Sequence, residues 1–173
     1  MPVSVTTGVA GTPITVPGLP YAVYVVPDGR TAYVEMNGGG TISLVDLVTG
    51  ALGDVITVPK GAGELAFNRA GSMAYANGNS ADAIGNQQFS YVTPINLVTD
   101  VAEAPIAILH DLFGIALSPD GRTTYVTGGT YPRGAVGPPI PPDVTAINLV
   151  TDQVSATNSI PGGASGIFNV TSG

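Results

Sequence analysis

The sequence predicts an all-β fold: an incomplete β-propeller of four-stranded antiparallel blades, with three full blades and parts of a fourth position. Two observations predict it. The stretch VVPDGRTAYV at 25–34 returns almost unchanged as LSPDGRTTYV at 117–126. The chain also holds 24 Gly and 15 Pro in 173 residues, which indicates many turns and few long helices. Because an active site usually needs its chemistry once, a repeated decapeptide indicates a repeated structural unit rather than an enzyme motif.

Two markers recur along the chain, a tyrosine and a Leu-Val-Thr triplet, and the spacing between them measures the repeat. From each Leu-Val-Thr triplet to the next marker tyrosine the distance is constant at 28 residues, whereas from tyrosine to triplet it grows from 14 to 22 and then 24. A period of about 40–50 residues is typical of propeller or solenoid arrays. The markers are Tyr33, Tyr75 and Tyr125, and the triplets at 47–49, 97–99 and 149–151.

The first unit is expected to form four strands, at 21–26, 31–35, 41–47 and 54–58. These short runs are rich in Val, Ile and Tyr, and they show strand-like alternation without a sustained helical period. Between the first two runs, Pro-Asp-Gly at 27–29 predicts a tight chain reversal. Proline presets φ, and glycine supplies the positive φ that lets the strands run antiparallel.

The second and third units repeat this pattern. In the second unit Asn-Arg-Ala-Gly-Ser replaces the Pro-Asp-Gly turn, but Gly71 keeps the glycine position, so we expect the hairpin to survive. Strands are expected at 63–67, 91–97 and 104–109 in the second unit, and at 113–118, 123–127 and 144–149 in the third.

The two ends of the chain resemble parts of further blades. Residues 3–7 and 12–16 match the third and fourth strands of a preceding blade, and 165–170 matches the first strand of a following one. Propellers usually close with about four to eight blades, so an open arc should leave an apolar face to be covered by self-association or a protein partner. The predicted organisation is one partial-propeller domain, 1–173, divided into 1–17, 18–59, 60–108, 109–160 and 161–173.

The recurring letters resemble the YVTN repeat of β-propeller proteins. Pro-Asp-Gly-Arg-Thr-Ala/Thr-Tyr-Val is followed by Ile-Asn-Leu-Val-Thr, and the eponymous tetrapeptide is nearly present as Tyr-Val-Thr-Gly at 125–128. It is degenerate at 33–36 and 75–78, and the resemblance covers almost the whole chain. It implies a multi-bladed, prokaryotic protein that is secreted or attached to the cell surface.

Insertions fall between the second and third strands of two units, at 78–89 and 128–142. In a propeller these loops open on the same face as the connections between blades. Loops on a rigid scaffold often carry binding residues, although long polar loops also cost little in closure entropy. The candidate ligand- or partner-binding residues on this face are Lys60, Glu64, Asn79, Asp82, His110, Asp111, Tyr131 and Arg133.

Catalytic and metal-binding interpretations of these residues are weaker than surface interpretations. His110 and Asp111 could form half of a general-base device, but no nucleophile elbow accompanies them. Asn77, Asn79 and Asp82 offer oxygen ligands in a spacing that matches no established calcium loop. We therefore predict no catalytic residue, no metal site and no cofactor.

The other candidates also have two interpretations. Lys60 and Glu64 could reach a ligand or form a solvated pair. Tyr131 and the prolines at 138–142 could present a polyproline segment to an aromatic groove, or hold a long loop stiff. Arg133 is the cation of that loop and could anchor an acidic ligand.

Composition excludes several classes of function. The net charge is −7 with five basic residues, so binding to nucleic acid is disfavoured. Cysteine is absent, which excludes disulfides and thiolate chemistry. No apolar stretch approaches the length of a membrane span, and the first residues show no signal peptide, so the compartment stays unknown apart from what the resemblance implies.

The preferred function is a non-enzymatic binding or scaffolding module. Its contacts would be made through the loops between second and third strands and those between blades. One alternative is a propeller enzyme resembling lactonases or quinoprotein dehydrogenases, completed by another chain. A further alternative is a structural repeat array at the cell surface.

Overall fold

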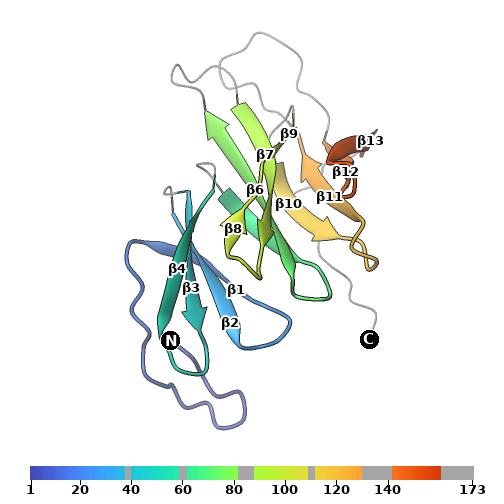
Figure 1. Ribbon diagram of the computed structural model, residues 1–173. Coiled ribbons are helices and arrows are strands. Elements are labelled where there is room, and N and C mark those ends of the chain that lie inside the picture. The colour runs from blue at the N-terminus through green and yellow to red at the C-terminus, as the bar shows by residue number, and fades with distance from the viewer. Residues whose placement is uncertain (38–39, 59–61, 82–87, 109–111, 130–141, 161–173) are drawn as a thin grey trace.

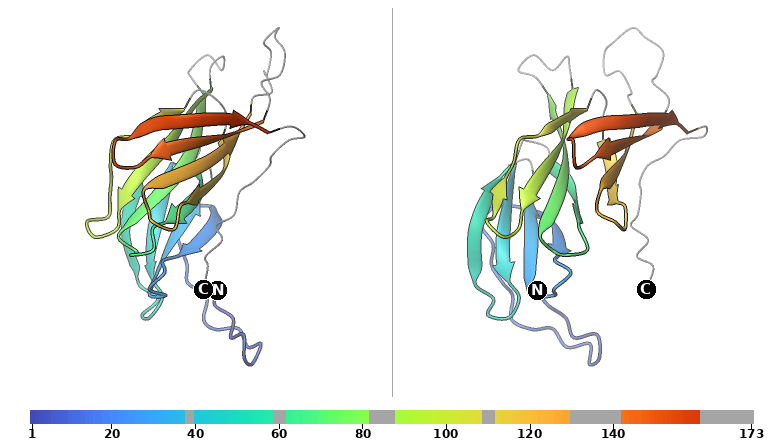
Figure 2. Two further views of the ribbon diagram at one scale, coloured as in Figure 1. Left: turned by 90° about the vertical axis from the view of Figure 1, so that its right-hand side faces the viewer. Right: turned by 45° about the vertical axis from the view of Figure 1, so that its right-hand side comes forward.

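The computed structural model describes residues 1–37, 40–58, 62–81, 88–108, 112–129 and 142–160, and all regular structure in them is β-strand. The strands form three antiparallel sheets that follow one another along the chain and stack face to face like the vanes of a fan (Figures 1 and 2). The predicted fold class, an incomplete propeller of antiparallel blades, is confirmed.

The first sheet has the order in which its strands occur in the chain. It contains β1 (Pro20–Val25), β2 (Thr31–Met36), β3 (Thr41–Asp46) and β4 (Leu52–Thr57). Each strand lies within two residues of its predicted bounds.

The second sheet has longer central strands and a divided last strand. It contains β5 (Ala62–Phe67), β6 (Met73–Ala81), β7 (Gln88–Asn96), β8 (Val101–Ala102) and β9 (Ile106–Ile108). Both short strands pair with β7, so the predicted strand at 104–109 is present at 106–108, whereas the separate strand at 101–102 was not predicted. The break lies opposite Pro94 and includes Pro105, and neither proline has an N–H to donate to the ladder.

The third sheet repeats the order of the first. It contains β10 (Leu112–Leu117), β11 (Thr123–Gly128), β12 (Asp143–Asn148) and β13 (Gln153–Ser159). The first three of these strands match the predicted runs closely.

The turn after the first strand of each sheet has the predicted geometry. Gly29, Gly71 and Gly121 have φ of 69°, 66° and 69°, so the altered second turn keeps the same backbone. In that turn Asn68 Oδ1 accepts from Ser72 N at 2.9 Å, where the other two turns use an aspartate. The expectation that the hairpin survives is confirmed.

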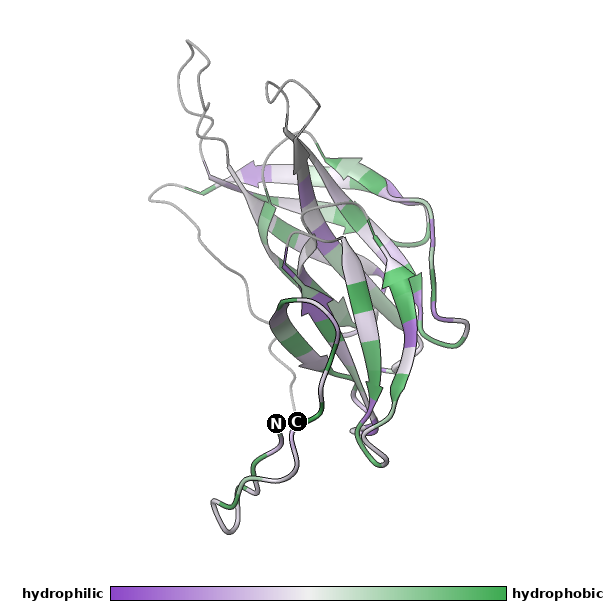
Figure 3. Ribbon diagram, turned by 90° about the vertical axis from the view of Figure 1, so that its left-hand side faces the viewer, coloured by the Kyte–Doolittle hydropathy of each residue, from purple (hydrophilic) through white to green (hydrophobic). Residues whose placement is uncertain are grey.

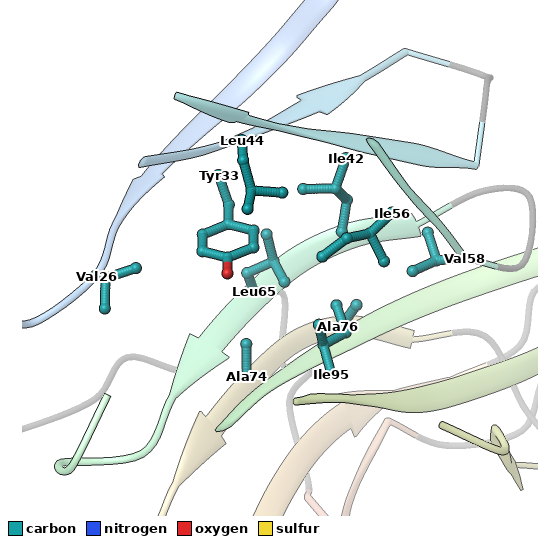
Figure 4. Packing of buried hydrophobic residues seen from close by; sticks show 10 residues of the cluster. All are labelled: Val26, Tyr33, Ile42, Leu44, Ile56, Val58, Leu65, Ala74, Ala76 and Ile95. Atoms are coloured by element: carbon teal, nitrogen blue, oxygen red, sulfur yellow. The ribbon is translucent and has the colours of Figure 1, made fainter. Parts of the chain in front are cut away.

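Apolar side chains fill the two spaces between the sheets. Between the first and second sheets, Tyr33, Ile42 and Leu44 pack against Leu65 and Ile95 (Figure 4). A second cluster joins the next pair of sheets, and residues alternate between hydrophobic and hydrophilic along the strands (Figure 3). These two layers hold the strand ends in fixed relative positions.

The N-terminal residues differ from the prediction. Residues 3–7 and 12–16 are not strands, and their one regular feature is an isolated bridge between Val3 and Ala10. A lone hairpin has little stability in water without a neighbouring sheet edge, and none is described beside it. Instead, Ile14 and Val16 pack on the first sheet, over a cluster formed by Ala32, Val34, Met36 and Val45.

The rest of that face of the first sheet is exposed. Tyr21, Val23 and Val25 of β1 are 70%, 62% and 51% exposed, although they alternate with residues that point into the core. Apolar residues in a row on a sheet face are typical of a surface that packs on another sheet.

Candidate functional site

The strand ends that flank the insertions and the connections between blades lie at one end of the molecule. β6 and β11 end where the two insertions begin, and both strands run toward the same end (Figures 1 and 2). Pairing of Ala62 with Gly78, and of Leu112 with Gly128, places the starts of β5 and β10 there too. We call this region, made by the ends of β2, β6 and β11 and the starts of β1, β5 and β10, the loop end.

Six of the eight predicted binding residues lie outside the described residues, and the structure does not test them. They are Lys60, Asp82, His110, Asp111, Tyr131 and Arg133. Glu64 and Asn79 are described, and both lie at the loop end.

Asn79 joins two sheets. Its Nδ2 donates to the carbonyl of Leu112 at 3.0 Å, and its Oδ1 accepts from Leu112 N at 2.9 Å. The same oxygen accepts from Ser90 Oγ at 2.6 Å. The Asn79 side chain thus links the backbone of β10 to β6 through hydrogen bonds, a structural role that the sequence did not indicate.

Glu64 lies at the start of β5 with its side chain exposed. Its backbone N–H donates to Asn77 Oδ1 at 2.6 Å, and the carbonyl of the preceding Gly63 accepts from the Tyr24 hydroxyl at 3.1 Å. Side chains of Tyr24 and Asn77 therefore fix the backbone around Glu64 by hydrogen bonds, while the Glu64 carboxylate faces solvent.

Three buried polar residues lie at the loop end; the sequence indicated Asn77 only as a calcium ligand and did not single out the other two. Glu35, Asn77 and Thr127 are 3%, 3% and 2% exposed. Glu35 Oε2, Asn77 Nδ2 and Thr127 Oγ1 have no hydrogen-bond partner in the described part of the chain. Each of the three lies two residues after a marker tyrosine, so aligning the repeats by tyrosine would have found a polar residue at the same position of every repeat.

The charge of Glu35 is set by its surroundings. Burial raises the pKa of this carboxyl to about 7, and the negative charge of Glu64 adds to the shift. Burial, with the charges of Glu35 and Glu64, also raises the pKa of the nearby Tyr24 hydroxyl to about 12. At neutral pH Glu35 is therefore close to half protonated and can either donate or accept a hydrogen bond.

The described residues contain no cluster of three or more His, Asp or Glu side chains that could hold a metal ion. Nor does the described part of the chain have a helix with the length and hydrophobicity needed to cross a bilayer. The loop end thus offers polar atoms on a rigid frame: a buried carboxyl, an amide nitrogen and a hydroxyl.

Comparison with known proteins finds likeness of structure. No family model matches the chain, and no curated protein matches its sequence. The hydrazine synthase of Kuenenia stuttgartiensis superimposes with a TM-score of 0.67 at 20% identity, over 84% of this chain and 43% of that one.

Two further solved structures are similar. U3-55K superimposes with a TM-score of 0.64 at 12% identity, over 84% of this chain and 40% of that one. The WD40 repeats of RRP9 give 0.63 at 13% identity, over 83% and 39%. This chain spans less than half the length of each of the three, and the likeness places it in the class of propeller folds.

Proposed function

We propose that this chain is a non-enzymatic binding or scaffolding propeller module whose ligand or protein partner is held at the loop end. The observation that carries the proposal is the row of Glu35, Asn77 and Thr127. Each is buried and each leaves a polar atom without a hydrogen-bond partner in the described residues. Since buried polar atoms are nearly always paired, three at one repeat position favour partners supplied from outside the frame.

The variable segments fit the same proposal. β6 and β11 lead into the two insertions at the end where these polar atoms lie, so we propose that a bound molecule contacts both. Glu64, with its exposed carboxylate, is one of the two described members of the proposed contact set, with Asn79. Asn79 acts mainly to fix the frame, and the other proposed contacts are Lys60, Asp82, His110, Asp111, Tyr131 and Arg133.

The finer assignment is to a YVTN-like repeat protein, prokaryotic and either secreted or at the cell surface, whose open arc associates with itself or with a protein partner. Support comes from the near-identical segments at 25–34 and 117–126 and from their matched turn geometry. The exposed face of β1 supports association.

One observation favours an enzyme as the second candidate. Glu35, with its pKa near 7, lies close enough to Glu64 for that carboxylate to influence it, and paired carboxyls of this kind serve general acid–base chemistry. Elemental analysis separates the two candidates, because the lactonases and quinoprotein dehydrogenases that the enzyme alternative resembles use metal sites. A stoichiometric divalent ion that survives dialysis would favour the enzyme.

A peptide-display selection tests binding at the loop end. The immobilised full chain would be screened, and the selected peptides ranked on two variants in which residues 82–87 or 130–141 are replaced by Gly-Ser. A matched control changes the opposite end, with Asp28→Ser and Asp120→Ser in the exposed turns. We expect affinity to fall at least tenfold in a loop variant and to stay unchanged in the control. Peptides that bind all forms equally would place the binding surface elsewhere.

A further inference from the structure

A tyrosine joins the first blade to the second. The Tyr33 hydroxyl, at the end of a side chain that is 2% exposed, donates to Asp100 Oδ1 at 2.8 Å. Asp100 lies in the turn between β7 and β8 of the next sheet. Hydrogen bonds to charged groups are stronger than neutral ones, so this contact links adjacent blades specifically.

The same residue types recur one blade later, as an electrostatic neighbourhood of Tyr75 and Asp152. Tyr75 takes the place of Tyr33, and burial followed by the negative charge of Asp152 raises the pKa of its hydroxyl. Asp152 lies between β12 and β13, at the position that corresponds to Asp100.

The two aspartates have an unusual backbone conformation. Among the described residues, Asp100 and Asp152 are the non-glycine positions with positive φ, at 55° and 54°. Gly50 holds this place in the first blade, with φ of 73°. Glycine adopts this left-handed conformation most readily, and aspartate is one of the few other residues that tolerate it. Both aspartates lie in a blade that packs against a buried marker tyrosine of the preceding blade.

Tyr125 is the third tyrosine of the series, and the described residues contain no acceptor for it. It is 38% exposed, against 2% for Tyr33 and 7% for Tyr75. It lies on the face of the third sheet that points away from the second, beside Ala116 and Ala146, its partners across the strands. Its neighbours are small, which leaves room for another sheet to pack on this face.

A second copy of the chain is a poor occupant of that face. The first blade of a second copy would place its own β3–β4 turn opposite Tyr125, and that turn carries Gly50. The turn does have an aspartate at Asp46, but Asp46 Oδ1 already accepts from Val48 N and Thr49 N at 2.7 and 2.8 Å. In the other two blades this capping position is Asn, and the left-handed position is Asp.

We propose that the Tyr125 face of the β10–β13 sheet receives a further four-stranded blade, supplied from outside these 173 residues. The identifying feature of that blade is its own aspartate, in left-handed conformation between its third and fourth strands. Only 13 residues follow Ile160, too few for four strands of the usual five to six residues. This interface is independent of the loop end, so either proposal can fail alone.

The full chain itself can supply a probe for this interface. The double substitution Asp46→Asn and Gly50→Asp rewrites the first turn as Asn-Leu-Val-Thr-Asp, the sequence that the second and third blades already fold in this conformation. The change keeps the net charge constant. A Cβ at position 50 would meet Ile14 Cγ1 at 3.7 Å, an ordinary contact, so the variant should fold.

Sedimentation equilibrium over a concentration series is the measurement. We expect the double variant to self-associate at least roughly tenfold more tightly than the wild type, as expected for a hydrogen bond to a charged group. Adding Tyr125→Phe should return association to the wild-type value. Adding Tyr33→Phe instead should leave it raised, because Tyr33 already donates to Asp100 within the chain. Equal association of the wild type and the double variant, or a gain that survives Tyr125→Phe, would overturn the proposal.

Discussion

Glu35 combines burial with a negative neighbour, and the two make the protein sensitive to pH. In the unfolded chain this carboxyl titrates near 4.5, whereas in the folded chain its pKa is about 7. Between these values the folded state binds more protons than the unfolded state, so the free energy of unfolding falls as pH rises. The stabilising effect is complete below pH 4.5 and is lost above about 7.

Glu35→Gln should remove this dependence. We expect the wild type to lose on the order of 1 kcal/mol between pH 4.5 and 7.5 through this group, after allowance for solvent screening, and the variant to lose less. Urea denaturation at several pH values measures the difference. Glu103→Gln is a control, since Glu103 is exposed and should leave the pH profile as it is. Parallel profiles for the wild type and Glu35→Gln would contradict the assignment.

Tyr33 and Tyr125 occupy the same repeat position in different surroundings, so each serves as a control for the other. Tyr33→Phe removes the hydroxyl that donates to Asp100 and should lower the free energy of unfolding by about 1–2 kcal/mol. Tyr125→Phe should change it by less than about 0.5 kcal/mol. Equilibrium urea unfolding distinguishes them, and equal losses would mean that the bond between blades adds no stability.

The repeat alignment predicted these tyrosines as structural markers but did not predict what they bond. Asp100 follows Tyr33 by 67 residues, and a contact at that separation exists only once the blades are stacked. The same holds for Asn79, expected as a ligand contact and found in bonds to Leu112. Sequence patterns indicate the side of a strand to which a residue points, whereas its partner depends on the neighbouring sheet.

At the level of strands and turns, local chemistry was sufficient to predict most of the fold. Alternation and the glycine turns placed β1, β2 and β3 within two residues. The divided strand at β8 and β9 was not predicted, because its cause is the meeting of two prolines across a ladder rather than either one alone. The predicted strands at 3–7 and 12–16 are absent for a related reason, since none of the described strands pairs with either segment.

Asn79 links strands of two sheets by hydrogen bonds, and replacing it should destabilise mainly β10. Asn79→Ala leaves the buried backbone N–H and carbonyl of Leu112 without these bonds, so we expect a loss of about 2–4 kcal/mol. Ser90→Ala removes only one bond to the same amide and should cost about 1 kcal/mol. Urea unfolding and hydrogen exchange at the Leu112 amide measure both, and fast exchange of that amide only in Asn79→Ala is the expected result. Similar effects of the two variants would show that the link to β10 is unimportant.

Across the whole molecule, equivalent faces of the three sheets differ in how much of their surface is buried by other parts of the chain. On the face turned toward the N-terminal end of the stack, Leu65 and Ile115 are 8% and 5% exposed because another sheet covers them. Val23, at the same place in the first sheet, is 62% exposed. The first sheet is thus built to be covered, and residues 12–16 cover only part of it.

This partial cover can be removed selectively. Ile14→Ser with Val16→Ser deletes the two side chains that pack over Val34 and Met36. We expect stronger fluorescence of a hydrophobic dye such as ANS and a loss of about 1–2 kcal/mol in the free energy of unfolding, in proportion to the apolar area exposed. Val5→Ser is the matched control, because Val5 is fully exposed and touches no cluster, and it should change neither quantity. If the double variant bound no more dye than the control, the N-terminal segment would not be shielding the face. The exposed Val23 and Val25 would then account for all dye binding at this end of the arc.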